Sequence, residues 1–421
     1  MTRIVFLAAS LIVSTFAWGH GGSGTNFVQI KAKDKFERSK IVNLGVSIEA
    51  VRSDSVFGMV SDEILEAIKS SDVEILETFK LEESKIHGLD FPSEDSRFHN
   101  YAEMTQALDA VVATRPEIMR KFSIGKTIQG RDIWAVQFNT SKDALTSNDP
   151  TKTSAKPGIV FMGNHHAREH VSAELPLMLV EYLAKNYGVD REITDLIDRR
   201  DIFFIPMVNP DGVEYDIASG NYRMQRKNMR PNGSGKVGVD LNRNYGYKWG
   251  TGGSSTQPSS DVYMGAAPFS EPETQAIKAF VEARPNLKVL LSFHTFSELI
   301  LYPWGHTYDS IAKKDDLATY ETMARKMATW NRYTPEQSSD LYIASGDTTD
   351  WSYGALGIFS FTFELSPRDM WDGGFYPGAK MIDKVFEDNL KPALYLIELA
   401  DDPHRAKTND PRLEWLMENE R

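Results

Sequence analysis

The chain of 421 residues is too long for one typical hydrophobic core and indicates more than one structural unit. Its net charge of −12 argues against a general nucleic-acid binder, because phosphate contacts need clustered Lys and Arg. Cysteine is absent, so disulfides, thiol catalysis and Cys-ligated zinc are excluded, and any metal must be held by His, Asp or Glu.

Residues 1–19 have the pattern of a signal peptide. Arg3 precedes an apolar run over 4–17, and Ala17 and Gly19 are small residues where a signal peptidase needs them. An uncleaved N-terminal anchor is the alternative, although the run is short for a membrane span. We expect a secreted or periplasmic protein with no membrane attachment after the signal is removed.

Residues 20–80 show the pattern of a small α+β unit. Ser61 is a candidate cap for a helix with apolar residues on one face. The predicted elements are a strand over 27–32, a helix over 34–44, two strands within 46–60, a helix over 61–71 and a strand over 73–79. The order β-α-β-β-α-β is typical of an open sandwich. A polar linker over 81–97 follows, with Lys85 and Arg97 as candidate processing sites.

From residue 98 to 402, predicted strands alternate with longer helices. Strands are predicted over 131–138, 158–163, 201–206, 287–294 and 357–364, and helices over 100–114, 170–186, 191–199, 271–283, 315–330 and 379–400. Ser270 and Glu273 have the spacing of a capping box. The alternation favours an α/β sandwich with a mostly buried sheet. We expect the charged tail, 403–421, to be disordered.

Three residues of this region form a candidate metal site. His166 and Glu169 follow a predicted strand and are three apart, which would place them on one face of a first helical turn. A catalytic zinc needs a third ligand, and His294 ends an apolar strand. The spacing alone is weak evidence. His165 and His170 lie beside the pair, and a lone histidine such as His294 can also be a core residue.

Five segments resemble, in the correct order, the carboxypeptidase A/B family of zinc peptidases. They are HHARE (165–169), VDLNRNY (239–245), SFHTFSELILYPWG (292–305), LYIASGDTTDWSYG (341–354) and FTFEL (361–365). The resemblance covers nearly all of 98–402. It implies a mixed central sheet sandwiched by helices and one zinc ion. The N-terminal unit resembles the prodomain that keeps these enzymes latent.

The resemblance assigns a role to each site residue. It implies that His166, Glu169 and His294 hold the zinc ion and that Glu364 is the general base. Asp240 matches a carboxylate that hydrogen-bonds a ligand histidine, although a strand-end cap is the alternative.

Further residues match the family's substrate contacts. Arg226 matches the arginine that stabilises the oxyanion, although an exposed basic loop is the alternative. Asn242 and Arg243 resemble the clamp for the substrate's terminal carboxylate, and Arg has the planar fork that fits a carboxylate. Tyr342 resembles the tyrosine that closes over the bound residue. Arg168 matches a more distant substrate contact, with a surface helix charge as the alternative.

Two residues bear on specificity. Thr349 matches the position that separates apolar from basic preference in the family, and it is neither aliphatic nor acidic. Asp347 replaces a small residue and could attract a Lys or Arg side chain, although a turn residue is the alternative. The combination resembles bacterial broad-specificity members of the carboxypeptidase T type. We therefore expect apolar C-terminal residues to be accepted and basic ones tolerated.

Two other functions are alternatives to a carboxypeptidase. A related zinc amidohydrolase, acting on peptidoglycan stem peptides or acyl-amino acids, would share the metal ligands but generally lacks the carboxylate clamp and tyrosine loop. An inactive relative that serves as a binding protein would have lost a ligand or the glutamate. The expected partners are peptide and protein C-termini, the prodomain as an inhibitor and an activating protease, and a monomer is expected.

Overall fold

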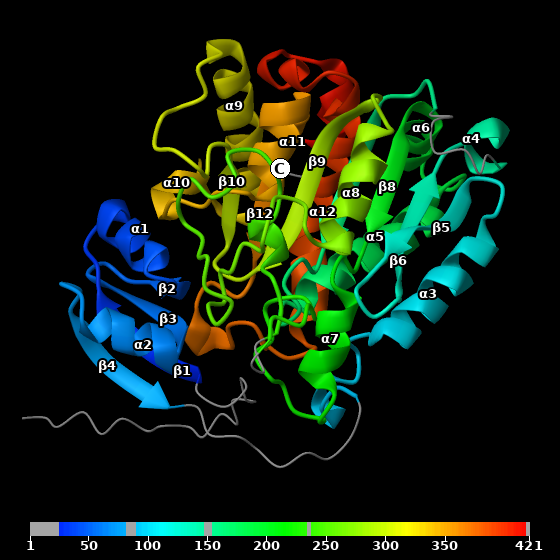
Figure 1. Ribbon diagram of the computed structural model, residues 1–421. Coiled ribbons are helices and arrows are strands. Elements are labelled where there is room, and N and C mark those ends of the chain that lie inside the picture. Colours follow the sequence, from blue (N-terminus) through cyan, green and yellow to red (C-terminus); the bar gives the residue numbers. More distant parts are fainter. Residues whose placement is uncertain (1–24, 81–89, 147–153, 234–236, 418–421) are drawn as a thin grey trace, which may run out of the picture.

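The computed structural model describes residues 25–80, 90–146, 154–233 and 237–417 (Figure 1). These residues fold into a small N-terminal unit and a larger unit that follows it along the chain. The expected signal peptide and the candidate processing residue Lys85 lie outside the described residues.

The N-terminal unit, residues 25–80, is a four-stranded antiparallel sheet with two helices packed on one face. Its elements are β1 (Thr25–Lys31), α1 (Lys35–Asn43), β2 (Ser47–Val51), β3 (Ser55–Ser61), α2 (Asp62–Lys69) and β4 (Ile75–Lys80). The strand order is β2-β3-β1-β4. This arrangement agrees with the expected α+β open sandwich.

Alternating side chains give this small sheet two apolar faces. Val28 and Ile30 of β1 pack with Ile64 of α2 in the unit's own core. Phe57 and Met59 of β3 belong to a second cluster, which includes side chains of the larger unit. Because successive side chains of a strand point to opposite faces, one face closes the small core and the other docks on the larger unit.

The larger unit is built on a mixed sheet of eight strands. These are β5 (Met119–Lys126), β6 (Asp132–Phe138), β7 (Gly158–Gly163), β8 (Asp201–Ile205), β9 (Leu287–Thr295), β10 (Leu299–Tyr302), β11 (Thr334–Gln337) and β12 (Phe359–Leu365). Their order is β11-β10-β12-β9-β7-β8-β6-β5. The central strands β12, β9, β7 and β8 pair in parallel, and β6 and β10 pair antiparallel with β8 and β12.

Helices cover both faces of this sheet (Figure 1). They are α3 (Tyr101–Thr114), α4 (Lys142–Thr146), α5 (Val171–Asn186), α6 (Arg191–Arg199), α7 (Pro210–Ile217), α8 (Pro272–Glu282), α9 (Lys314–Asn331), α10 (Ser338–Leu341), α11 (Thr348–Leu356) and α12 (Met381–Glu398). Strand β7 shows the layering. Ile159 and Phe161 share a core with α5 and α12, whereas Val160 and Met162 share one with α8 and α11. The expected α/β sandwich with a mixed central sheet is confirmed.

Three strands of the large sheet were not predicted. Strand β5 lies at one edge of the sheet, where its side chains are only partly buried and include Arg120 and Lys121. Strands β10 and β11 have four residues each, and β11 contains Pro335 at the opposite edge. Edge strands lack the continuous apolar pattern of buried parallel strands, so the sequence carries little signal for them.

The predicted capping box of α8 is wrong. The helix is preceded by Glu271, and no side chain caps it. The Oγ of Ser270 donates to the Oε1 of Glu271 instead. Glu273 turns away from the helix start, and its carboxylate accepts hydrogen bonds from the backbone N–H of Ile128 and from the Nδ2 of Asn228. Tertiary partners therefore replace the local cap.

The expectation of a disordered C-terminal tail is wrong for residues 403–417. Leu413 and Leu416 are buried in the main core. The guanidinium of Arg405 binds the buried carboxylate of Glu398 at 2.9 Å. Two short 3-10 turns, Pro403–Lys407 and Pro411–Leu416, form the segment. Its charges therefore serve ion pairs that hold the tail on α12.

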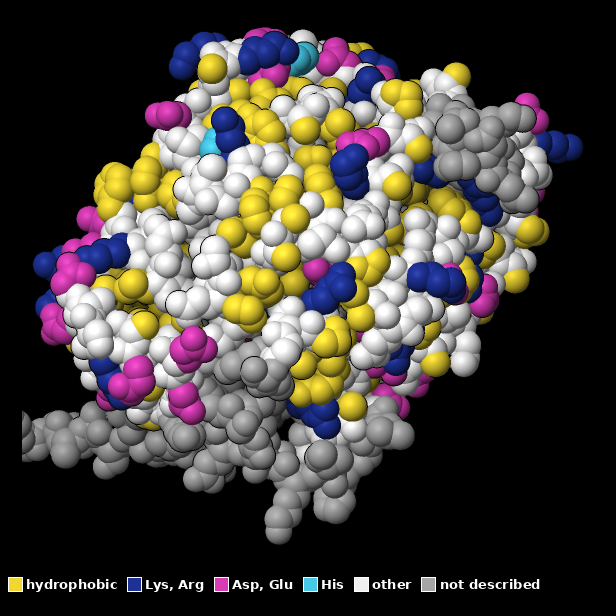
Figure 2. Space-filling view, viewed as in Figure 1, with side chains coloured by type: hydrophobic (Ala, Val, Ile, Leu, Met, Phe, Trp, Pro, Cys, Tyr) yellow, Lys and Arg dark blue, Asp and Glu magenta, His cyan; other side chains and the backbone are white. Residues whose placement is uncertain are grey.

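The surface of the face shown in Figure 2 is mixed in character. Lys and Arg side chains are scattered there among acidic and apolar ones and do not form one broad basic patch. Among the described residues, no helix combines the length and the apolar character that a membrane span requires.

Candidate metal centre and substrate pocket

His166 and Glu169 lie in a turn between β7 and α5, not on the first helical turn as predicted. The backbone N–H of Glu169 donates to the carbonyl of His166 at 3.2 Å. The Nδ2 of Asn164 donates to the carbonyls of His166 and Ala167 at 3.1 and 3.3 Å. These bonds fix the turn and keep both side chains on one side of it.

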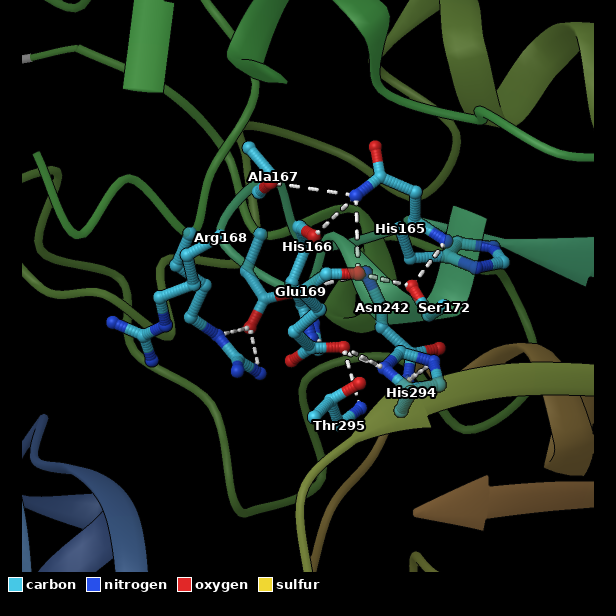
Figure 3. A network of polar contacts seen from close by, with 12 residues as sticks. His165, His166, Ala167, Arg168, Glu169, Ser172, Asn242, His294 and Thr295 are labelled. Atoms are coloured by element: carbon cyan, nitrogen blue, oxygen red, sulfur yellow. Dashed lines mark hydrogen bonds and ion pairs between the residues drawn. The ribbon is translucent and has the colours of Figure 1, made fainter. Parts of the chain in front are cut away.

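The predicted ligands His166, Glu169 and His294 come together at the carboxyl ends of β7 and β9, and all three are buried (Figure 3). The carboxylate of Glu169 lies 2.7 Å from the Nδ1 of His166 and 3.0 Å from the Nδ1 of His294. The two Nδ1 atoms are 3.1 Å apart. Two imidazole nitrogens and one carboxylate oxygen, all within 4.8 Å of one another, fit the donor set of a catalytic zinc ion.

Asp240 contacts the nitrogen of the His166 ring that does not face Glu169. Its Oδ1 lies 3.1 Å from the Nε2 of His166, which leaves Nδ1 free to bind a metal. The same oxygen accepts from the backbone N–H of Asn242, so the cap predicted as an alternative is present too. Although burial opposes it, the neighbouring Arg226 guanidinium and His166 hold the pKa of Asp240 well below its usual range. A charged Asp240 favours the Nε2–H form of His166.

Arg226 is buried and not part of an exposed basic loop. Its Nε and Nη2 bind the Oδ2 of Asp240 at 3.0 and 2.9 Å. The side chain also lines the cavity together with the candidate ligands His166 and Glu169. Arg226 is therefore a fixed cation beside the candidate metal site.

Glu364 lies on β12 directly opposite His294 of β9 in the parallel register. It lines the same cavity as His166 and Glu169. Burial, with the nearby carboxylate of Glu169, raises the pKa of Glu364 well above its usual range. A cation at the metal site would offset the Glu169 charge and return Glu364 toward the ionised form.

Asn242 and Arg243 form a short 3-10 turn directly after Asp240, and both line the cavity. The Oδ1 of Asn242 accepts from Thr348, which leaves the Nδ2 amino group for other partners. The Nε of Arg243 donates to the carbonyl of Gly253 and its Nη1 to the carbonyl of Asn242, each at 2.8 Å. These bonds set the direction of both side chains at the cavity wall.

Tyr342 also lines the cavity, at the end of α10. Burial raises the pKa of its phenol. The cavity has a volume of about 410 Å³ and is lined by eight of the twelve residues predicted for the site. These eight are His166, Glu169, Arg226, Asn242, Arg243, Tyr342, Asp347 and Glu364, and two more, His294 and Asp240, are in direct contact with His166.

The two predicted specificity residues differ in position. Asp347 lines the cavity, and its Oδ1 caps the backbone N–H of Asp350 at 2.7 Å. Its Oδ2 is buried with no hydrogen-bond partner among the described residues. Thr349 does not line the cavity, because its hydroxyl pairs with that of Thr362 at 2.7 Å. Thr362, which the sequence analysis missed, occupies the wall.

Arg168 is fully buried, so the alternative of a surface helix charge is wrong. Its Nη2 binds both carboxylate oxygens of Glu49, on β2 of the N-terminal unit, at 2.8 Å. Its guanidinium also lies 4.2 Å from the centre of the Phe375 ring. Sequence reasoning missed Glu49, because nothing in its local pattern marks a contact with a residue 119 positions away.

Helix α1 of the N-terminal unit holds the segment around Tyr342. Arg38 donates to the carbonyls of Leu341 and Asp340 at 2.6 and 2.9 Å. The hydroxyl of Ser39 accepts from the backbone N–H of Ile343 at 2.8 Å. Residues 48–51 of β2 and the following Arg52 line the cavity as well. The N-terminal unit therefore lies over the entrance to the candidate site.

A second group of potential ligands lies elsewhere, at the start of α9. Asp315, Asp316 and His404 place one ligand atom each within 4.8 Å of one another. Lys407 pairs with Asp315, and Lys313 pairs with Asp316 at 3.0 Å. These ammonium groups already neutralise the two carboxylates, so the group is an ion-pair network.

Comparisons with known proteins identify relatives of this chain. A family profile described as zinc carboxypeptidase matches residues 104–392. A zinc carboxypeptidase from Saccharothrix mutabilis subsp. capreolus is 40% identical over 296 residues, which are 68% of this chain and 66% of that protein. Carboxypeptidase A2 from Rattus norvegicus is 33% identical over 361 residues, which are 82% of this chain and 81% of that protein.

A solved structure supports the fold. Carboxypeptidase A from Helicoverpa armigera superposes with a TM-score of 0.71 over 92% of this chain and 99% of that chain, at 23% identity. The profile match and the relatives carry the assignment of the family. The chain belongs to the zinc carboxypeptidase family and is a metallocarboxypeptidase whose cofactor is one Zn²⁺ ion.

Proposed function

We propose that this protein is a secreted exopeptidase that hydrolyses the last peptide bond of peptides and proteins and accepts apolar and basic C-terminal residues. The proposal rests on a single cavity lined by two of the candidate metal ligands, His166 and Glu169, by Glu364 and by the donors Asn242 and Arg243. The third candidate ligand, His294, contacts both His166 and Glu169. Metal, base and carboxylate clamp are thus available to one bound chain end.

His166, Glu169 and His294 would hold the zinc ion. When bound, zinc supplies Lewis acidity, which polarises the scissile carbonyl and makes water a stronger acid. Glu364 accepts the proton of the attacking water and delivers it to the leaving amine, so that a C–O bond forms and the C–N bond breaks. Arg226 stabilises the negative charge on the carbonyl oxygen, an effect of about 3–4 kcal/mol for one donor.

The restriction to chain ends is assigned to Asn242, Arg243 and Tyr342. The side-chain amino group of Asn242 and the guanidinium of Arg243 donate to the terminal carboxylate, which an internal peptide bond lacks. Tyr342 lies at the cavity wall beside α10 and covers the bound residue. Arg168 contacts the substrate further from the scissile bond once Glu49 is removed.

Recognition of basic C-terminal residues is assigned to Asp347. Its Oδ2 is buried at the cavity wall and has no hydrogen-bond partner within the described part of the chain, and a Lys or Arg side chain would satisfy it. Burial, with the neighbouring Asp350, raises the pKa of Asp347 well above its usual range. An empty pocket therefore holds a neutral carboxyl group that also tolerates apolar side chains, and a bound cation would favour its ionised form.

The N-terminal unit, residues 20–80 of the expected prodomain, is assigned the role of inhibitor. Glu49 forms an ion pair with Arg168 and so blocks its contact with substrate. Helix α1 hydrogen-bonds the backbone on both sides of Tyr342. Cleavage in the linker 81–97 would release this unit. Of the two candidate processing residues we favour Lys85, because Arg97 pairs with Asp383 and the next residue, Phe98, is buried.

Secretion is inferred from the signal peptide pattern of residues 1–19, and a monomer is proposed.

The test of the exopeptidase proposal uses the full chain after cleavage with trypsin. Free amino acids are measured from peptides that end in Phe, Leu, Arg or Glu and from peptidoglycan stem peptides. Release of Phe, Leu and Arg supports the proposal. Cleavage of stem peptides alone would instead point to the amidohydrolase alternative.

A further inference from the structure

His165 is a buried histidine outside the candidate metal group. It lies two residues after the end of β7, and its ring projects away from the Glu169 carboxylate (Figure 3). Its Nδ1 lies 3.2 Å from the hydroxyl of Ser292 on β9. Its Nε2 lies 2.9 Å from the hydroxyl of Tyr245 and 3.2 Å from that of Thr348. The ring is thus hydrogen-bonded at both nitrogens.

Thr348 connects this ring to Asn242. Its backbone N–H and its hydroxyl both donate to the Oδ1 of Asn242, at 3.0 and 2.9 Å. The N–H can only donate, so the amide must present its oxygen to Thr348 and its Nδ2 amino group to the cavity. That amino group lies 3.4 Å from the Nε2 of His294. Asn242 is therefore oriented as a donor for a substrate carboxylate.

The direction of the hydrogen bonds depends on His165. A neutral imidazole has one N–H and one acceptor nitrogen. With the proton on Nε2, the Ser292 hydroxyl donates to Nδ1, and His165 donates toward the oxygens of Tyr245 and Thr348. The Thr348 hydroxyl then directs its own hydrogen to Asn242. With the proton on Nδ1, the Thr348 hydroxyl would be drawn to Nε2 and Asn242 would lose one of its two donors.

The same ring supports a candidate metal ligand. The rings of His165 and His294 are stacked, with centroids 5.6 Å apart and planes inclined by 15°. Ser292, Tyr245 and Thr348 come from three separate segments of the large unit. His165 is therefore packed between the third metal ligand and the residue that orients the carboxylate clamp.

We propose that His165 is a positioning residue for substrate binding, which acts as the Nε2–H tautomer through Thr348 to hold the Asn242 amide ready for the substrate's terminal carboxylate. The inference rests on the proposed function, since it requires Asn242 to bind that carboxylate. Its effect is on affinity for a free carboxylate and not on the chemical step.

The test substitutes His165 in the full chain, which is then cleaved with trypsin and loaded with zinc. His165→Phe keeps a stacked ring but removes the hydrogen bonds at both ring nitrogens, and it should raise KM for a peptide with a free carboxylate about 3- to 10-fold while kcat and zinc content stay unchanged. His165→Gln restores a donor near the Nε2 position and should recover most of the affinity. Binding of 3-phenylpropionate, measured by calorimetry, should weaken in parallel.

Thr348→Val tests the same connection without changing the histidine. It removes the hydroxyl but keeps the backbone N–H, and it should weaken carboxylate binding to a similar extent. Thr274→Val is the matched control, because Thr274 is also buried and its hydroxyl also donates to an asparagine, Asn244, away from the cavity. It should leave KM unchanged.

A double-mutant cycle tests whether His165 acts through Asn242. In an Asn242→Ala background, His165→Phe should have no further effect on binding of 3-phenylpropionate. An undiminished effect in that background, or unchanged KM in both His165→Phe and Thr348→Val, would overturn the inference. If Asn242→Ala itself leaves carboxylate binding intact, the proposed clamp fails as well, and the two failures are thereby distinguished.

Discussion

Glu364 and His294 lie directly opposite each other in the parallel pairing of β12 and β9. Opposite residues of parallel strands point to the same face of a sheet, so the candidate base and the third candidate ligand are aligned by the sheet itself. Strand pairing, and not a flexible loop, therefore sets the distance between the carboxyl group and the metal group.

Replacement of the Glu364 carboxyl by an amide should remove the general base. Glu364→Gln is expected to lower kcat about a thousandfold, because general-base catalysis contributes about 10²–10⁴-fold. Zinc content should stay unchanged, since Glu364 is not one of the three candidate ligands. Steady-state kinetics and metal analysis on the same preparation check both points. Loss of zinc together with activity would show that the residue acts on the metal site.

The Asp347 carboxylate should control release of basic residues. Asp347→Asn keeps an oxygen for the α11 cap and removes the charge. The kcat/KM for peptides ending in Arg or Lys should fall about 10- to 100-fold, the range of a hydrogen bond to a charged group, and that for Phe should not fall. If Thr349→Val shifts this ratio and Asp347→Asn does not, the assignment of Asp347 is wrong.

The bidentate pair between Glu49 and Arg168 should keep the uncleaved chain inactive. Glu49→Gln removes the carboxylate that pairs with the buried Arg168 at 2.8 Å and leaves the longer contact with Asp261 at 3.4 Å, so docking of the N-terminal unit weakens by up to about 3–5 kcal/mol. The activity of the uncleaved chain should therefore rise at least about tenfold. Glu63→Gln is the control, because Glu63 accepts from Ser259 at the same interface but is exposed. Equal activity in both variants would contradict an inhibitory role of Glu49.

The buried carboxyl group of Glu273 should make stability depend on pH. Burial raises its pKa from about 4.5 to about 7. The folded chain binds more protons than the unfolded chain between these values, so the free energy of unfolding falls as pH rises through this window, by about 3 kcal/mol in total.

Glu273→Gln should abolish this part of the pH dependence. Urea denaturation at several pH values between 4.5 and 7 measures it, and Glu282→Gln, at the partly exposed end of the same helix, is the control. An unchanged slope in Glu273→Gln would show that Glu273 titrates near its usual pKa.

Buried strands and the clustering of the candidate metal ligands were predictable for a common physical reason. Strands β7 and β9 are covered on both faces, so their sequences are continuous apolar runs, and the polar residues that end them stand out. The edge strands β5 and β11 carry no such pattern. The order of residues 403–417 could not be predicted, because ion pairs such as Arg405–Glu398 depend on partners that charge content alone does not reveal.

Contacts between distant segments account for the site features that could not be predicted from the sequence. Glu49 meets Arg168 only because the N-terminal sheet docks on the larger unit. Thr362, and not Thr349, reaches the cavity because the hydroxyl of one binds that of the other. Side-chain direction of this kind follows from packing, whereas sequence spacing fixes only which residues share a strand or a helix face.

The central claim is that this chain removes C-terminal residues by means of one zinc ion and a carboxylate clamp. The most direct measurement compares one peptide ending in Phe with its C-terminal amide, using the trypsin-cleaved chain before and after treatment with a chelator. The account predicts release of Phe from the free acid only, loss of release on chelation, and recovery with one equivalent of zinc. Equal hydrolysis of acid and amide, or activity that survives removal of the metal, would contradict it.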